Sequence, residues 1–172
     1  TLSGFALDGM TRDHGWRFLS MGRRIERLQF LCGALQQALA GPADADLVWL
    51  LELADSSITY RSRYMARPEW LPVLDLLVRD GTNPRSIAFQ LKGLHDFLGR
   101  ISDAYGEGVD ERLKDAVAGL EGLDPGADLR HGSARLAQLL GEWHDASFRL
   151  SEQIGLRFFS HVGEVNRQTF GV

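Results

Sequence analysis

The sequence predicts an all-α protein, a single compact bundle of about six helices. Two observations carry this prediction. Hydrophobic residues recur at helical spacings in every informative segment, and no stretch shows the strict alternation of a β-strand. Glycine, proline and capping residues interrupt the pattern at short intervals. Connections of only a few residues favour antiparallel neighbours, so the helices are expected to pack into one domain covering residues 1–172.

The first predicted helix extends to residue 40 and has apolar residues on two faces. One stripe consists of Phe18, Met21, Ile25, Leu28, Cys32, Leu35 and Leu39. The other consists of Trp16, Leu19, Arg23, Glu26 and Phe30. A helix that is apolar on two faces packs inside a bundle, so we expect Arg23 and Glu26 to form a largely buried ion pair. The substitution Glu26→Ala would then cost about 3–5 kcal/mol.

The charges of this helix allow two interpretations. The Arg23–Glu26 pair can fix the register of the helix, or the arginines can hold an anionic ligand or a partner carboxylate. Arg17, Arg24 and Arg27 lie between the two stripes, where they could be solvated or could reach a neighbouring helix.

The later helices follow from their start and stop signals. They are expected at about 47–64, 69–79, 84–104, 109–120 and 128–165. Asn83 is the expected N-cap of the helix at 84–104, with Pro84 at its first position. Residues 123–127 are expected to form a linker.

The composition indicates an ordinary soluble protein: 44% of the 172 residues are hydrophobic and 24% are charged. A formal net charge of −4 argues against a general nucleic-acid binder, and no apolar run is long enough to span a bilayer. We therefore expect a cytoplasmic protein with neither nucleic acid nor membrane as a partner. The single cysteine, Cys32, is expected in the core. Because the chain begins at Thr1, we expect a fragment or a processed product.

No catalytic motif is visible in the sequence. It contains no Glu-x-x-His pair for a di-iron site, no phosphate-binding loop and no nucleophile elbow. We therefore predict no metal and no cofactor, and we assign no catalytic residue. Whether the protein is an enzyme stays open, although the sequence favours a non-enzyme.

Two polar clusters remain, each with a structural and a functional interpretation. Residues 55–64 carry hydroxyls, tyrosines and arginines, and Asp55, Thr59 and Arg63 would share one face of a continuous helix. Residues 83–86 form a good helix start, where free N–H groups also favour anions. The candidate binding residues are Arg12, Asp13, Arg17, Arg23, Arg24, Glu26, Arg27, Asp55, Thr59, Arg61, Arg63, Asn83 and Arg85.

Four segments, in this order, resemble the alpha-E domain, a bacterial all-helical family named for a Glu-Arg motif. They are residues 10–19, Gly22-Arg-Arg-Ile-Glu-Arg27, 51–61 and 83–91. The resemblance covers residues 10–91, and beyond residue 100 only the helical pattern supports it. The chain resembles the C-terminal part of this longer domain.

The resemblance implies a functional setting. Members of the family are encoded beside, or fused to, a circularly permuted ATP-grasp protein and near transglutaminase-like proteases. This implies a non-catalytic partner or scaffold for a system that forms peptide or amide bonds. The partner would be the ATP-grasp ligase or its peptide substrate, contacted through Arg17, Arg24, Arg27, Arg61 and Arg63. The alternative is an enzyme or ligand-binding domain whose arginine- and hydroxyl-lined pocket takes an anionic or peptide substrate.

Overall fold

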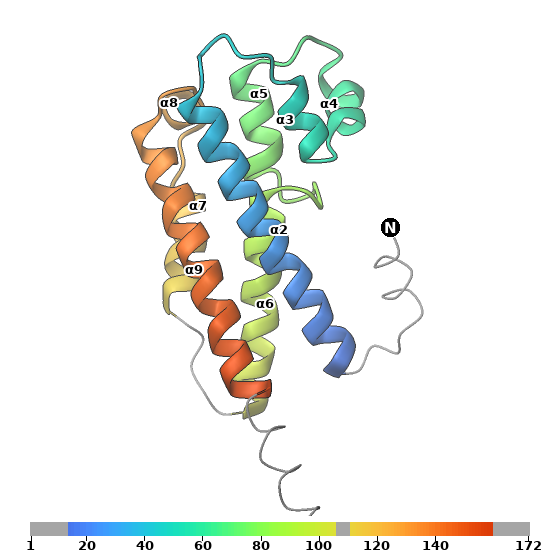
Figure 1. Cartoon of the computed structure of the whole chain (residues 1–172), viewed down its shortest axis with the longest axis vertical. Coiled ribbons are helices and arrows are strands. Elements are labelled where there is room, and N and C mark those ends of the chain that lie inside the picture. The colour runs from blue at the N-terminus through green and yellow to red at the C-terminus, as the bar shows by residue number, and fades with distance from the viewer. Residues whose placement is uncertain (1–13, 106–110, 160–172) are drawn as a thin grey trace, which may run out of the picture.

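Three long helices run along the length of the molecule. The structure is a computed structural model, and it describes residues 14–105 and 111–159. Helix α2 (His14–Ala40) packs against α6 (Ile87–Tyr105) and α9 (Ala134–Phe159) (Figure 1). Helix α7 (Glu111–Glu121) packs against both α6 and α9. The described residues form helices and no strand, so the prediction of an all-α fold is confirmed.

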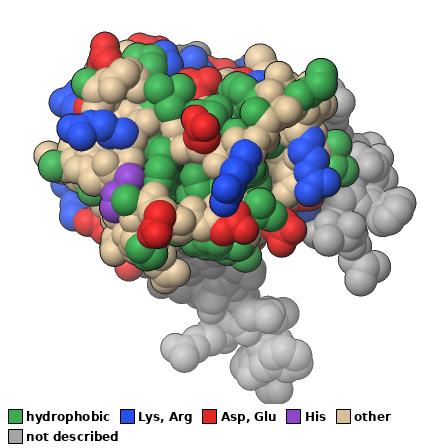
Figure 2. All heavy atoms as spheres, turned by 90° about the horizontal axis from the view of Figure 1, so that it is seen from above, with side chains coloured by type: hydrophobic (Ala, Val, Ile, Leu, Met, Phe, Trp, Pro, Cys, Tyr) green, Lys and Arg blue, Asp and Glu red, His purple; other side chains and the backbone are tan. Residues whose placement is uncertain are grey.

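Short helices cover one end of this bundle. They are α3 (Val48–Leu53), α4 (Ser57–Tyr64), α5 (Trp70–Leu74), the π-helical turn η1 (Asp75–Arg79) and α8 (Pro125–Asp128). Acidic, basic and hydrophobic side chains are interspersed on the face seen from this end (Figure 2). That face therefore presents no patch of a single charge.

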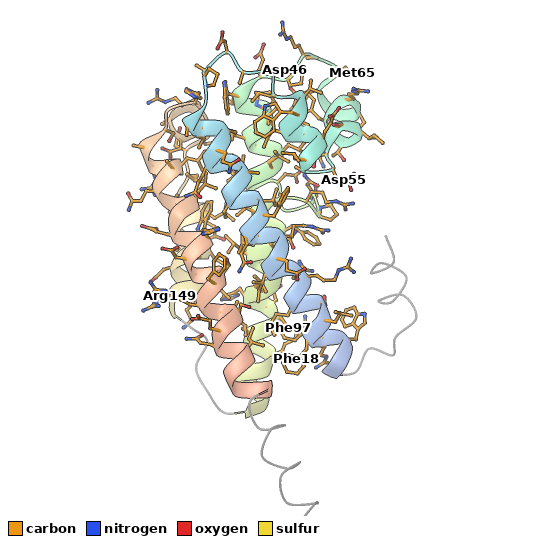
Figure 3. The ribbon with its side chains drawn as sticks, viewed as in Figure 1. Phe18, Asp46, Asp55, Met65, Phe97 and Arg149 are labelled. Carbon is orange, nitrogen blue, oxygen red and sulfur yellow. The ribbon has the colours of Figure 1, made fainter. Side chains whose placement is uncertain are left out.

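The first apolar stripe of α2 forms the centre of the core, as predicted. Its buried members are Met21, Ile25, Leu28, Cys32, Leu35 and Leu39. Phe18 of α2 and Phe97 of α6 are partly buried against this core at the lower end of the bundle (Figure 3). Burial raises the pKa of the Cys32 thiol to about 12, so the thiol stays protonated near neutral pH. The prediction that Cys32 is a core residue is confirmed.

A tryptophan joins α7 to α9. The Trp143 side chain is fully buried, and its indole nitrogen donates a hydrogen bond to the Ala116 carbonyl oxygen at 3.1 Å. Gly119 allows the close approach of the two helices, because a Cβ atom at this position would lie 2.9 Å from a methyl carbon of Leu139. Trp143 thus links the two helices, and Gly119 lets them pack closely.

The expected helix at 47–64 is in fact two helices. Asp55 adopts a left-handed backbone conformation with φ of 50°, and the backbone N–H of Ser56 donates back to Leu51 O at 2.8 Å. Aspartate tolerates this conformation better than most residues do, so the chain can turn here without glycine. The prediction that Asp55 shares a helical face with Thr59 and Arg63 is therefore wrong.

Helix α6 begins at Ile87, later than predicted. Its first turn is capped by the side chain of Ser86 and not by that of Asn83. Ser86 Oγ accepts a hydrogen bond from the Phe89 N–H at 3.1 Å. Asn83 instead accepts one from the Arg85 N–H at 3.0 Å, which forms a turn ahead of the helix.

The predicted linker at 123–127 is also partly helical. Its residues lead into α8, where Asp124 caps the helix by accepting a hydrogen bond from the Ala127 N–H at 2.7 Å. Within the described residues, no helix is both long and apolar enough to cross a bilayer.

Candidate functional site

The second stripe of α2 lies on the surface, contrary to prediction. Leu19 is 40% exposed, Phe30 is 49% exposed and Glu26 is exposed, while Trp16 and Arg23 are half-buried. The neighbouring helices α6 and α9 cover the first stripe, which leaves the second stripe facing outward. The prediction that Arg23 and Glu26 are largely buried is therefore wrong.

The exposure of Glu26 changes the stability expected of its variant. We expect Glu26→Ala to lower the free energy of unfolding by less than about 1 kcal/mol, because an exposed carboxylate loses little when it is removed. Urea denaturation followed by circular dichroism measures this change. A loss of about 3 kcal/mol or more would show that the carboxylate is desolvated after all.

Arg24 crosses from α2 onto α6. Its guanidinium donates a hydrogen bond to Phe89 O at 3.1 Å and stacks over the Phe89 ring, 4.7 Å from the ring centroid. Gly93, one turn further along α6, provides the space, because a Cβ atom there would lie 2.4 Å from a guanidinium nitrogen of Arg24. Burial lowers the pKa of Arg24, and the nearby Asp96 opposes that lowering. The sequence left open whether Arg24 is solvated or reaches a neighbouring helix, and the structure shows that it contacts α6.

Arg27 lies one turn along α2 and is also half-buried. Its guanidinium is 3.4 Å from Pro84 O, a long and weak hydrogen bond. Burial lowers the pKa of Arg27 most, followed by the positive charges of Arg85 and Arg23, while Asp55 opposes the lowering. The positive charges of Arg85, Arg23 and Arg24 therefore act together on Arg27, and the charge of Asp55 acts against them.

Two shallow hollows meet at Arg27. The first, which we term the arginine hollow, has a volume of about 180 Å³ and is lined by Ser20, Arg23, Arg24, Arg27, Phe89 and Gln90. The second has a volume of about 130 Å³ and is lined by Arg27, Phe30, Leu31, Leu53, Ala54, Asp55 and Arg85. Because they share Arg27, the two hollows form one surface that runs from α2 across to α3 and the start of α6.

The two polar clusters that the sequence shows separately contact each other. Asp55, where α3 meets α4 (Figure 3), forms an ion pair with Arg85. The buried Asn83 amide donates to Leu76 O at 3.1 Å and to the buried hydroxyl of Ser56 at 3.5 Å. These bonds connect the end of α3 to η1 and to the segment before α6. The polar residues at these positions therefore have a structural role that requires no ligand.

Arg63 is engaged in the same region. It forms an ion pair with Asp80 and donates to Thr82 Oγ1 at 3.0 Å. Burial alone would raise the pKa of Asp80, but hydrogen bonds from Thr82 and Arg63 outweigh it and hold that pKa below its ordinary value. Arg63 therefore acts as a structural residue that links α4 to the loop after η1.

The candidate residues thus divide into three sets. The structure brings Arg23, Arg24, Arg27, Asp55 and Arg85 together along the two hollows. Thr59, Arg61, Arg63 and Asn83 do not line these hollows, and neither do Arg17 and Glu26, which are exposed on α2. Arg12 and Asp13 fall outside the described residues.

Sequence reasoning missed three residues of the arginine hollow, namely Ser20, Phe89 and Gln90. Ser20 could have been found, because it precedes Arg23 and Arg24 by three and four positions on the same helix. Phe89 and Gln90 could not, because their place depends on which helix packs beside α2. Among the described residues, no group of three or more His, Cys, Asp or Glu side chains could hold a metal ion.

The comparison with protein families identifies the fold. The model of the Alpha-E family, described as "a predicted alpha-helical domain with a conserved ER motif", matches residues 1–159. The chain belongs to the Alpha-E family. Its sequence contains two Glu-Arg pairs, Glu26–Arg27 on α2 and Glu111–Arg112 at the start of α7. Arg27 of the first pair lines both hollows.

Relatives of this Alpha-E domain occur in mycobacteria. It is 35% identical over 122 residues to Uncharacterized protein Rv2567 of Mycobacterium tuberculosis and to Uncharacterized protein Mb2597 of Mycobacterium bovis. Each match covers 68% of this chain and 14% of the relative, so the chain spans a small part of the length of these proteins. No solved structure matches the chain.

Proposed function

We propose that this Alpha-E domain is a non-catalytic partner of an ATP-grasp-linked system that forms peptide or amide bonds. It would bind the circularly permuted ATP-grasp ligase, or the peptide on which that ligase acts, and a transglutaminase-like protease would be a further partner. The observation that carries the proposal is the surface around Arg27, which combines arginines with exposed apolar side chains.

The composition of this surface suits protein recognition. Arginine and aromatic side chains are enriched in the cores of protein interfaces. Arg27 lies beside Phe30 and Leu53, which are 49% and 51% exposed and line the same hollow. An apolar contact flanked by guanidiniums would fit an acidic segment or an acidic face of a partner.

The size of the two hollows at Arg27 argues against an enclosed substrate pocket at this place. At about 180 and 130 Å³, both are smaller than typical small-molecule sites, which measure roughly 300–1,000 Å³. Within the two polar clusters, the Asn83 amide and the Ser56 hydroxyl are used in structural hydrogen bonds. The arginine surface therefore supports a docking role better than a reaction.

Calorimetry of the chain with ATP–Mg²⁺ and with the ATP-grasp ligase of the same organism tests this proposal. We expect no heat of nucleotide binding, because the sequence has no phosphate-binding loop. We expect association with the ligase that weakens as salt is raised, because surface charges steer such encounters. Saturable nucleotide binding without ligase association would replace the partner role by an enzymatic one.

A further inference from the structure

We propose that Arg24 and Arg27 form a binding site for one small oxyanionic group, a carboxylate or a phosphate, within the arginine hollow. This inference rests on the proposed function and deepens it, since the group would belong to the acidic partner or peptide. Three features of the hollow carry the inference: unused hydrogen-bond donors, an unbalanced local charge and a preorganised guanidinium.

The first feature is the donor capacity of the two guanidiniums. Each arginine carries five N–H donors in a fixed fork. Within residues 14–105 and 111–159, Arg24 uses one of them on Phe89 O, and Arg27 makes the 3.4 Å contact with Pro84 O and no other hydrogen bond. The ion pairs that Arg63, Arg79, Arg85 and Arg135 form with aspartates do not involve Arg24 or Arg27. Most donors of Arg24 and Arg27 are thus available for an external acceptor.

The second feature is the local charge. Arg23, Arg24 and Arg27 line one hollow, and the charge of Arg85 also acts on Arg27. Asp55, the carboxylate that opposes this repulsion at Arg27, is already paired with Arg85. Because both Arg24 and Arg27 are half-buried, water screens their repulsion less than it would for exposed side chains. An anion in the hollow would offset this repulsion.

The third feature is the preorganisation of Arg24. Its guanidinium contacts the carbonyl oxygen and the ring of Phe89 and lies close to the backbone at Gly93. Little side-chain freedom is then lost when a ligand binds, which favours binding. The volume of about 180 Å³ suits a single anionic group with a few attached atoms, and it is too small to enclose a nucleotide.

The test is an NMR titration of the arginine Nε–H signals at constant ionic strength, with sodium chloride as the balancing salt. The probes are inorganic phosphate and N-acetylglutamate. The decisive variant is Gly93→Ala, which keeps every charge but pushes the Arg24 guanidinium away from Phe89. The matched control is Gly99→Ala on the same helix, where a Cβ atom meets no other group within 4 Å.

We expect saturable shifts of the Arg24 and Arg27 signals with at least one probe. Gly93→Ala should weaken binding by about tenfold and Gly99→Ala by no more than about twofold. Tighter binding of phosphate would identify a phosphorylated ligand, and tighter binding of N-acetylglutamate an acidic peptide or protein segment; both support the site.

Two results would overturn the inference: shifts that never saturate with either probe, and equal weakening by the two glycine substitutions. The outcome is separable from that of the proposed function. Ligase association without saturable anion binding would remove this site and leave the partner role standing. Saturable anion binding without ligase association would support this site and contradict the partner role.

Discussion

Trp143→Ala is expected to lower the free energy of unfolding by about 3–5 kcal/mol, the range for removing a large aromatic side chain from a packed core. Trp143 is fully buried, and its indole nitrogen donates to Ala116 O across the α7–α9 contact. The substitution would leave a cavity between the two helices and remove the hydrogen bond that joins them. Urea denaturation monitored by far-ultraviolet circular dichroism measures the loss.

Phe148→Ala on the same helix is the matched control. Phe148 is 51% exposed, so we expect its loss to change the free energy of unfolding by less than about 1 kcal/mol. Comparable losses for Trp143→Ala and Phe148→Ala would mean that α9 does not pack with Trp143 facing α7.

Asn83→Ala is expected to cost about 2–3 kcal/mol, because it removes hydrogen bonds from buried groups that water cannot reach. The Asn83 side chain is 2% exposed, donates to Leu76 O and to Ser56 Oγ, and accepts from the Arg85 N–H. Its removal takes away a contact of η1, a contact of the α3–α4 turn and the turn before α6. Thermal or urea denaturation gives the change in stability.

Ser57→Ala provides the control for this prediction. The Ser57 hydroxyl is buried and has no hydrogen-bond partner in the part of the chain that the structure describes, so its removal should be neutral or slightly stabilising. If Asn83→Ala were as mild as Ser57→Ala, the amide of Asn83 would not join η1, the α3–α4 turn and the start of α6.

The sequence predicts the buried face of α2 because that face depends on a local period. Met21, Ile25 and Leu28 recur at helical spacing, and all three are buried. The outer stripe could not be predicted in the same way. Leu19 and Phe30 are as apolar as core residues, but whether they are covered depends on how many helices surround α2. Periodicity shows which residues share a face, and only the packing shows what lies against it.

Local signals also compete where helices begin. Asn83 and Ser86 are both good capping residues, and nothing in the sequence favours Ser86 over Asn83. The choice follows from a tertiary contact, because Leu76 O and Ser56 Oγ draw the Asn83 amide inward. The break before α4 has a similar origin in the left-handed conformation of Asp55, which hydrophobic spacing does not reveal.

The arginines of the site can be found from the sequence, but their geometry cannot. Whether Arg24 is solvated or reaches a neighbour depends on α6 lying beside α2. A glycine inside a helix costs roughly 1 kcal/mol relative to alanine, but this does not single out Gly93 in the sequence. Gly99 lies on the same helix and a Cβ atom there would meet no other group within 4 Å, whereas a Cβ atom at Gly93 would meet the guanidinium of Arg24.

The arginine hollow, as we propose, mediates association with an acidic partner. The most direct test measures how tightly two variants bind the ATP-grasp ligase. Each variant removes two positive charges: Arg24→Gln/Arg27→Gln in the hollow, and Arg67→Gln/Arg130→Gln, whose side chains are exposed and do not line the hollow. We expect calorimetry to show at least about tenfold weaker binding for the first variant and less than about twofold for the second. Equal weakening by both variants, or unchanged affinity of the first, would contradict a docking role for the hollow.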